Sequence, residues 1–257
     1  MRTLLIDGDI LIYKIASQNE EPTHWGDGLW TLHCDEKICK AEVDKQIQEL
    51  LDNLEADKFI IALTDKKNFR KDILPSYKDN RKQKRKPLAL PFLRQYCIEK
   101  YEAVIMDSLE ADDVLGILST EPSNEERIIV SIDKDLYQIP GKISKDGKTF
   151  EEISEDEANY WHMMQTLTGD STDGYSGCPG IGVKTAQKVL GDHANVPLLD
   201  LWMRALAAYA KVGYSTDEAL AQARVARILR NNDYDRETGG IKLWQTCLLY
   251  TSDAADE

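Results

Sequence analysis

The chain has 257 residues and a net charge of −13, which is long enough for one large domain or two modest ones with a sizeable core. This negative charge argues against a protein that binds nucleic acid nonspecifically over its whole surface. The five cysteines form no C-x-x-C pair and the four histidines do not cluster, so neither a zinc site nor a disulfide framework is predicted. No apolar run approaches the ~20 residues of a membrane span, and we expect no membrane partner and a cytoplasmic location.

The first 150 residues alternate apolar, strand-like runs with amphipathic helical patterns. The runs that predict strands are 3–7, 58–64, 102–106, 127–132 and 142–144. The helical patterns between them are 10–16, 34–54, 90–100 and 110–118. This alternation predicts an α/β domain with a mostly parallel sheet. Sites in such sheets form at the carboxyl ends of strands, which here carry Asp7, Asp65, Asp107 and Asp133.

After about residue 155 the strand signal disappears. Ser154-x-x-Glu157 is a capping box that opens a predicted helix to residue 168. Further helical patterns cover 183–190, 198–210 and 217–230, and a second capping box, Ser215-x-x-Glu218, opens the last of them. We therefore predict two domains, 1–155 and 156–246, of which the second is small and helical.

Acidic residues recur in a fixed order along these elements. They follow the first strand, open the helix at 110, follow the strand at 127–132, and stand in a Gly-Asp-x-x-Asp: Asp7, Glu110, Asp112, Asp113, Asp133, Asp135, Asp170 and Asp173. The helix dipole favours acids in a first turn and could alone explain Glu110 to Asp113. It does not explain Asp133 and Asp135, because a buried strand end rarely tolerates two uncompensated carboxylates. Hard oxygen ligands suit Mg²⁺ or Mn²⁺, so the pattern predicts metal-dependent phosphodiester chemistry.

A basic segment covers residues 66–86, with ten Lys or Arg against two Asp. Such an island in an acidic protein is typical of a localised phosphate-binding element, although a solvated charged loop is the alternative. Lys78 and Arg81 would face the same way in a helix and could stabilise charge on a scissile phosphate. Removing one such group typically costs ~10²–10³ in rate. General affinity for a nucleic-acid strand suits the following cations better: Lys82, Lys84, Arg85 and Lys86.

A glycine-rich turn lies between Gly177 and Gly182. Gly180 and Gly182 permit close approach of the backbone, and the helix that follows presents N–H groups and its positive end to a phosphate. Lys184 and Lys188 add charge one turn apart. A plain turn between helices is the usual alternative, and the position just after Asp173 favours the phosphate-binding interpretation.

Several motifs occur in one order over residues 3–244. They are Leu5-Ile-Asp-Gly-Asp9, Phe69-Arg70 with Tyr77-Lys-Asp-Asn-Arg81, Leu109-Glu-Ala-Asp-Asp113, Ser131-Ile-Asp-Lys-Asp135, and Gly169-Asp-Ser-Thr-Asp173 with Pro179-Gly-Ile-Gly-Val-Lys-Thr-Ala186. Together they resemble the flap endonuclease/5′-nuclease superfamily. Trp161-His162, Gln165-Thr166 and Ala226-Arg-Ile-Leu-Arg230 are more similar to the 5′→3′ exonucleases of short-tailed lytic phages.

The resemblance implies a PIN-like nuclease domain over 1–155, with a basic arch or clamp at 66–87, and a helix–three-turn–helix DNA-binding domain over 156–246. It implies two Mg²⁺ ions, with Mn²⁺ as a substitute, among the eight acidic residues named above. Lys78 and Arg81 would be catalytic residues at the scissile phosphate. A K⁺ ion would sit at the turn, where Cys178 departs from the family pattern. The implied DNA-binding residues are Arg70, Lys82, Lys84, Arg85, Gly180, Gly182, Lys184, Thr185 and Lys188.

The function implied by the resemblance is a 5′→3′ exonuclease on duplex DNA that also removes RNA from RNA–DNA hybrids and cuts 5′ flaps. It would act by two-metal hydrolysis as a monomer, with phage replication proteins as partners, in the cytoplasm of an infected bacterial host. One alternative is a haloacid-dehalogenase-type phosphatase, because a strand followed by Asp7-x-Asp9 resembles its nucleophile loop. Another is a DNA-binding protein on the same fold without catalysis, which the complete set of acidic residues disfavours.

The last eleven residues, 247–257, resemble the in-frame translation of a sequencing adapter. A genuine disordered tail is the alternative. In either case we expect this segment to carry no function.

Overall fold

The computed structural model describes residues 1–81, 84–191 and 196–245. They form two compact units, each of which is treated by itself. The sheet unit consists of Met1–Lys67, Lys84–Lys134 and Gly141–Glu152, and the helical unit consists of Asn68–Gln83, Asp135–Pro140 and Ile153–Glu257. In the described ranges, no helix is both long enough and apolar enough to cross a membrane.

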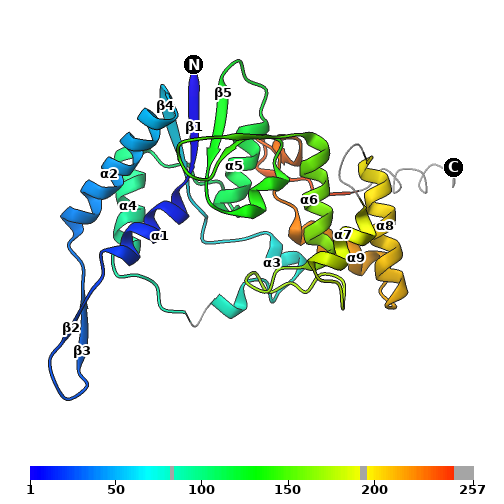
Figure 1. The fold of residues 1–257 in the computed structure, drawn as a ribbon, viewed down its shortest axis with the longest axis horizontal. Coiled ribbons are helices and arrows are strands. Elements are labelled where there is room, and N and C mark those ends of the chain that lie inside the picture. Colours follow the sequence, from blue (N-terminus) through cyan, green and yellow to red (C-terminus); the bar gives the residue numbers. More distant parts are fainter. Residues whose placement is uncertain (82–83, 192–195, 246–257) are drawn as a thin grey trace. The chain divides into compact units, whose positions relative to one another are not determined.

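A five-stranded sheet forms the centre of the sheet unit, in the order β4-β1-β5-β6-β7. Figure 1 labels β4, β1 and β5 of this sheet. Its strands are β1 (Arg2–Asp7), β4 (Lys58–Ala62), β5 (Glu126–Val130), β6 (Gly141–Ser144) and β7 (Glu151–Ile153). β1 is parallel to both β4 and β5, with Ile6 opposite Ile61 on one side and Val130 on the other, and β6 is parallel to β5. The predicted parallel α/β arrangement is therefore present.

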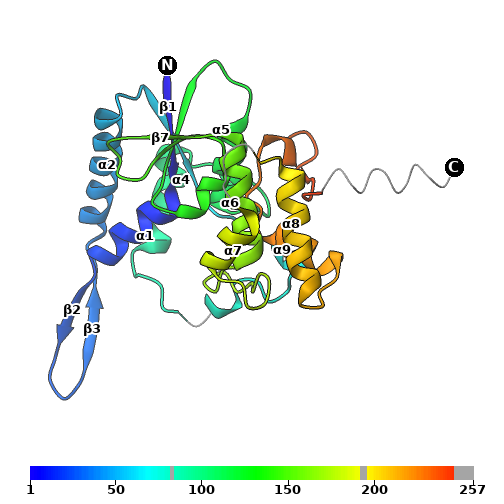
Figure 2. The same cartoon turned by 45° about the vertical axis from the view of Figure 1, so that its right-hand side comes forward.

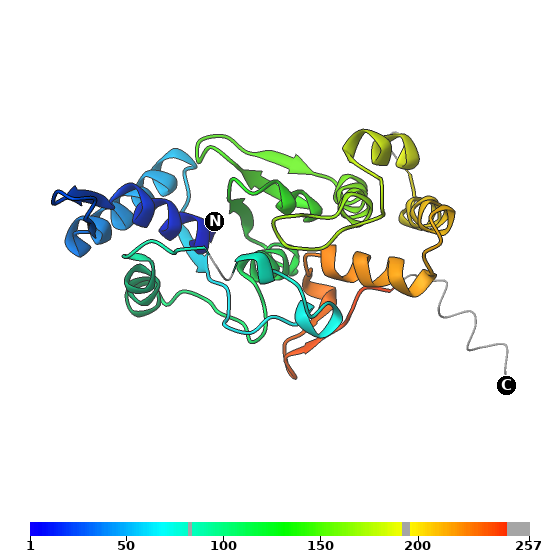
Figure 3. The ribbon, with the colours of Figure 1, turned by 90° about the horizontal axis from the view of Figure 1, so that it is seen from below.

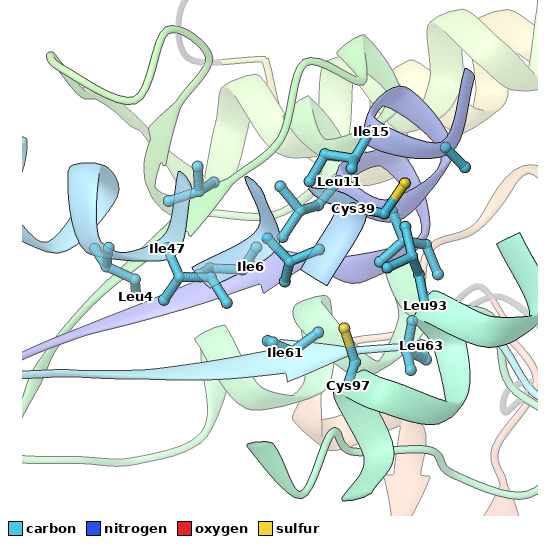
Figure 4. Close-up of a cluster of buried hydrophobic side chains, with 14 of the residues drawn as sticks. Leu4, Ile6, Leu11, Ile15, Cys39, Ile47, Ile61, Leu63, Leu93 and Cys97 are labelled. Atoms are coloured by element: carbon cyan, nitrogen blue, oxygen red, sulfur yellow. The ribbon is translucent and has the colours of Figure 1, made fainter. Parts of the chain in front are cut away.

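Helices cover both faces of β1, as expected for a parallel strand that is buried on two sides. They are α1 (Gly8–Gln18), α2 (Glu36–Asn53), α4 (Leu90–Tyr101) and α5 (Ala111–Thr120). Leu4 and Ile6 share one core with residues of α1, α2 and α4, such as Ile15, Ile47 and Leu93 (Figure 4). Leu5 points to the opposite face because side chains alternate along a strand; α5 also packs against β1.

The structure of this unit lacks one predicted strand and contains three strands that were not predicted, of which β7 is one. The predicted strand at 102–106 is reduced to a single bridge between Val104 and Ala62, because Glu102 adopts a left-handed conformation that ends α4. An antiparallel hairpin of β2 (Glu21–His24) and β3 (Trp30–His33) was not predicted. All its strand residues are exposed, and it extends from between α1 and α2 (Figure 2). Its short strands bury no alternating apolar face, which is the pattern that would have revealed them.

Four helices pack around a second core in the helical unit, drawn from green to orange in Figure 3. They are α6 (Glu155–Thr168), α7 (Val183–Leu190), α8 (Leu198–Lys211) and α9 (Thr216–Ala226). Both predicted capping boxes are formed, at Ser154 and at Ser215. α9 ends four residues earlier than predicted, because Arg227 is already extended.

Several short elements complete this unit: α3 (Arg70–Ile73), the 3₁₀ helices η1 (Asp79–Arg81), η2 (Lys134–Gln138, which begins on the last residue of the sheet unit) and η3 (Asn231–Asp233), and a ribbon of β8 (Tyr234–Asp235) and β9 (Gly240–Ile241). The ribbon shows that the region after residue 155 is not entirely helical. Its two-residue strands are too short to give a periodic signal in the sequence.

The compact units differ from the predicted division at residue 155 in two segments. Residues 68–83, predicted as part of the first domain, belong to the helical unit. The buried Arg70 donates from Nε to the Val225 carbonyl, at 2.9 Å, and from Nη2 to the Arg227 carbonyl, at 2.6 Å. Residues 135–140 join the same unit, where the Gln138 amide donates to the Ala226 carbonyl at 2.9 Å. The predicted adapter-like tail lies outside the described residues.

Candidate active site

The carboxyl edge of the sheet unit brings three chain segments together. Because β1, β4 and β5 are parallel and in register, Asp7, Thr64 and Ser131 all lie at or just beyond the same edge. Asp7 is 4% exposed. Its carboxylate accepts hydrogen bonds from the Ile10 backbone N–H, which caps α1, and from the Ser131 hydroxyl at 2.8 Å. The acid at the end of β1 is thus held in one orientation.

The environment of Asp7 disfavours its negative charge. Burial is the main cause and raises its pKa to about 6, against the lowering effect of the hydrogen bonds from Ile10 and Ser131. The neighbouring carboxylates of Asp9 and Asp133 raise it further. A buried acid whose charge is opposed by two other acids would be stabilised in its ionised form by a nearby cation.

Ser131 links two of the predicted metal ligands. Its hydroxyl donates to Asp7 and accepts from the Asp133 backbone N–H at 3.1 Å. In the sequence motifs, Ser131 is only the first residue of the Ser131-to-Asp135 block and has no predicted role. A serine between an apolar strand and an acid was the available signal, because a hydroxyl there can satisfy both neighbours.

Asp9 and Asp65 hold loops at this edge. The Asp9 carboxylate accepts from the Thr64 backbone N–H at 3.0 Å and pairs with Arg94 of α4 at 3.6 Å. Asp65 accepts from the Ser108 backbone N–H at 2.9 Å, and this bond contributes most to lowering its pKa. Arg94, which also donates to the Thr64 carbonyl, was not identified from the sequence, where nothing distinguishes it from other surface cations.

The three acids at the start of α5 are unequally exposed. Glu110 is 8% exposed and Asp113 is fully buried, whereas Asp112 is half-buried. The Asp113 carboxylate accepts from the Glu110 backbone N–H at 3.2 Å. The Ala111 N–H donates to the Thr64 hydroxyl at 3.0 Å, which ties the helix start to the end of β4.

Asp173 is the centre of the cluster in the helical unit. Its carboxylate accepts from the Tyr77 hydroxyl at 2.9 Å and lies 3.4 Å from the Lys78 ammonium. Arg81 also pairs with it. Both residues predicted to act on the scissile phosphate therefore contact one predicted metal ligand.

Backbone contacts hold the segment that carries these cations. The Lys78 N–H donates to the Asp173 carbonyl at 2.7 Å, and the Asn80 amide donates to the Ser171 carbonyl at 2.7 Å. Lys78 has a φ of 57°, a left-handed conformation that costs a side-chain-bearing residue free energy. The Lys78 side chain is 20% exposed and that of Arg81 is 44% exposed, so the arginine is the more accessible of the two.

The acids of the helical unit gather around Tyr175. The pKa of this buried hydroxyl is raised well above its usual range, first by burial and then by the negative charges of Asp135, Asp170 and Asp173. Asp170 accepts from the Thr172 backbone N–H at 2.6 Å. The structure thus divides the eight predicted ligands, with five in the sheet unit and three in the helical unit. Within the described ranges, no three His, Cys, Asp or Glu side chains form a group spaced to hold a metal ion.

The glycine-rich turn has one buried and one open side. Gly177 needs its φ of 61°, and an added Cβ would lie 2.3 Å from the Gly169 nitrogen. Cys178 is buried in the helical core, and its N–H donates to the Leu167 carbonyl at 2.8 Å. The cysteine that departs from the family pattern is therefore a core-packing residue. Gly180 and Gly182 are exposed with open space beside them; the K⁺ site stays a prediction.

The predicted DNA-binding side chains differ in accessibility. Lys184, Thr185 and Lys188 are exposed on α7, as are Lys84 and Lys86 in the sheet unit. Arg70 differs from these residues: it is 3% exposed and donates to backbone carbonyls, so its guanidinium supports the fold, and its DNA-binding role stays a prediction. Lys82 lies outside the described residues.

Arg85 has a partner within the sheet unit. Its guanidinium forms two hydrogen bonds with the Glu20 carboxylate, at 2.8 and 2.6 Å. These bonds lower the pKa of Glu20 to about 2. Because Glu20 directly precedes β2, the pair ties the end of the basic segment to the base of the hairpin.

Comparison with known proteins gives consistent matches. The family described as "5′-3′ exonuclease, N-terminal resolvase-like domain" matches residues 2–160. The exodeoxyribonuclease of Enterobacteria phage T3 is 30% identical, over 94% of this chain and 92% of its own length. The exonuclease of Escherichia phage T7 is 29% identical, over 94% and 93%. The fold is similar to a crystal structure of the flap endonuclease of bacteriophage T5 in a pseudo-enzyme–product complex with DNA and metal ions, with a TM-score of 0.57, 17% identity and coverage of 88% of this chain and 99% of that one.

Proposed function

The chain belongs to the 5′-3′ exonuclease family, and we propose that it removes nucleotides from the 5′ ends of duplex DNA and cuts 5′ flaps in a reaction that needs Mg²⁺. The observation that carries this proposal is the buried Asp7 at the carboxyl edge of the sheet, with Asp9 and Asp133 close enough to raise its pKa. Family membership and this arrangement of acids leave the phosphatase alternative without support.

The chemistry of the acids in the sheet unit suits a divalent metal ion, although no three of these side chains are grouped around one position in the described structure. The donors are all carboxylate oxygens, which Mg²⁺ and Mn²⁺ prefer, and the charge of Asp7 is opposed by burial and by other acids. We assign Asp7 and Asp133, with Glu110, Asp112 and Asp113, as the ligands of this unit. A bound divalent ion would lower the pKa of water and stabilise charge on the departing oxygen. The roles of Asp135, Asp170 and Asp173 as ligands stay predictions.

The protein's own groups hold two of these acids, Asp7 and Asp133, in place. The Ser131 hydroxyl and the Ile10 N–H fix both oxygens of Asp7, and the Ser131 contact to the Asp133 backbone fixes the second acid relative to the first. Ligands held in this way need little reorganisation when a phosphate is bound, which is the main source of electrostatic catalysis.

Lys78 and Arg81 supply positive charge. Both now contact Asp173, so phosphate oxygens would compete with this carboxylate for the same cations. An exposed arginine can bind a phosphate through two parallel hydrogen bonds. These contacts involve phosphates, which DNA and RNA share and which carry no base sequence directly. We therefore extend the proposal to the RNA strand of RNA–DNA hybrids, in the setting of phage DNA replication.

The test is digestion of duplex DNA that carries a different label at each end, together with flapped and RNA–DNA hybrid substrates, with and without Mg²⁺. We expect release of short products from the 5′-labelled end only, and only with the metal ion. Release from the 3′-labelled end, or equal release in EDTA, would contradict the proposal.

A further inference from the structure

A basic cavity lies between α7 and α8 of the helical unit. Its volume is about 380 Å³, and its lining includes Thr185 and Lys188 of α7 with Arg204, Ala207, Ala208 and Lys211 of α8. Thr185 and Lys188 belong to the predicted DNA-binding residues, whereas no residue of α8 does. The cavity therefore adds residues that no motif identified.

The spacing along α8 creates this cavity. Arg204, Ala207, Ala208 and Lys211 stand three, four and seven positions apart, so they form one stripe on the helix. The two cations are about 10 Å apart along the helix axis, and the two alanines between them leave a shallow floor. Lys188 faces this floor from α7.

Arg204 is held in place by the neighbouring helix. Its Nη1 donates to the Leu190 carbonyl at the end of α7. Gly191 follows with a φ of 78°, and an added Cβ there would lie 2.9 Å from this same nitrogen. The guanidinium therefore occupies a fixed position that the glycine leaves free, and one wall of the cavity is preorganised.

The described lining of the cavity is positively charged. Among the residues that the structure describes, the lining has three cations and no acidic side chain, in a protein whose net charge is −13. Among the described parts of the chain, no salt bridge involves Lys188, Arg204 or Lys211. Three cations and the Thr185 hydroxyl around a small floor suit a phosphate group.

We propose that this cavity binds a backbone phosphate of duplex DNA, so that the DNA-binding surface extends from α7 onto α8. The inference rests on the proposed function, because it takes DNA as the substrate. The described lining residues include no aromatic ring on which a base could stack, which favours a backbone phosphate over a free nucleotide. Lys211 is the test residue, since it is exposed in the last turn of α8 and Arg204 also supports the fold.

The experiment measures binding of the full chain to a flapped duplex in Ca²⁺ over a range of NaCl concentrations. The variants are Lys211→Ala, Lys188→Ala and the double variant, with Lys242→Ala as the control, an exposed lysine of the same unit outside the cavity. We expect Lys211→Ala to weaken binding about tenfold, as for loss of one charged hydrogen bond. The slope of log K against log[NaCl] should become shallower by about 0.9, the value for one phosphate contact. Lys242→Ala should match the unaltered chain.

The outcomes separate this inference from the proposed function. If the unaltered chain neither binds nor cuts the duplex, the proposed function fails. If it binds and cuts but Lys211→Ala keeps the same affinity and slope, the cavity inference alone fails. A third arm adds inorganic phosphate or a deoxynucleoside monophosphate as an inhibitor. If Lys211→Ala relieves that inhibition without changing duplex binding, the cavity holds free product and the inference is overturned. If the inference is correct, Lys211→Ala raises KM for the duplex and leaves kcat unchanged.

Discussion

The acids at the sheet edge and those around Asp173 are stabilised in different ways. In the sheet unit, Asp7 is buried against a serine hydroxyl and a backbone N–H, with two other acids nearby, and its pKa rises to about 6. In the helical unit, Asp173 contacts Lys78, Arg81 and the Tyr77 hydroxyl. In the first group, burial and neighbouring acids oppose the charge of Asp7, and a bound divalent cation would stabilise it. In the second group, Asp173 is paired with Lys78 and Arg81 of the same chain. A substrate phosphate would bind these two cations in place of Asp173.

The strongest test of this contrast removes one charge from the sheet edge. Asp133→Asn should abolish cleavage, by at least ~10³-fold, because a neutral amide is a poor metal ligand, while binding to DNA in Ca²⁺ persists. Cleavage rates with Mg²⁺ and gel-shift affinities measure the two properties. The matched control is Asp107→Asn, an exposed acid after α4, which should change the rate by less than about threefold. Normal turnover in Asp133→Asn would rule out the metal assignment.

The next test removes countercharge from the helical unit. Lys78→Ala should lower kcat by ~10²–10³, the usual effect of losing one preorganised group at a developing charge. Lys84→Ala, in the same basic segment but without a described partner in this cluster, should mainly weaken binding and lower the salt dependence. Equal effects of the two changes would mean that the basic segment only attracts DNA electrostatically.

The next test compares a buried cation that supports the fold, Arg70, with a surface cation, Lys71. Arg70→Ala should lower the free energy of unfolding by about 2–4 kcal/mol, because the Val225 and Arg227 carbonyls lose a charged donor in a buried place. Lys71→Ala should change it by less than about 0.5 kcal/mol, since its pair with Asp79 is exposed. Denaturant titration measures both. A stable Arg70→Ala that binds DNA poorly would restore the predicted DNA-binding role.

The smallest expected effect concerns how the free energy of unfolding changes with pH. His162 is fully buried, and burial, with the charges of Arg227 and Arg230, lowers its pKa well below the usual 6.5. Its Nε2 lies 2.8 Å from the Ala223 carbonyl. Below about pH 6.5, His162 gains a proton in the unfolded chain but not in the folded chain. The contribution of His162 to the free energy of unfolding is therefore complete above that pH and is lost as the pH falls.

The slope should reach at most about 1.4 kcal/mol per pH unit. Urea titrations between pH 7.5 and 5.5 on the unaltered chain and on His162→Gln measure the contribution. An identical pH dependence in both proteins would contradict the assignment to His162.

Much of the fold was predictable because its signals are local. The apolar runs of β1, β4 and β5 and the two capping boxes at Ser154 and Ser215 depend on residues within one turn or one strand. The same locality explains the errors, since the β2–β3 hairpin and the β8–β9 ribbon bury too little to leave a pattern.

The order of the acids and their flanking residues, read from the chain alone, identified the family and the candidate ligands. Folding decided how each one is held. Ser131 joins Asp7 to Asp133, Lys78 and Arg81 meet on Asp173, Arg70 becomes a buried support, and α8 supplies Arg204 and Lys211 beside Lys188. Apart from the pair Ser131 and Asp133, which are two positions apart, these contacts join residues between 7 and 157 positions apart in the chain or depend on burial. No local pattern encodes them, because they arise only when separate elements pack.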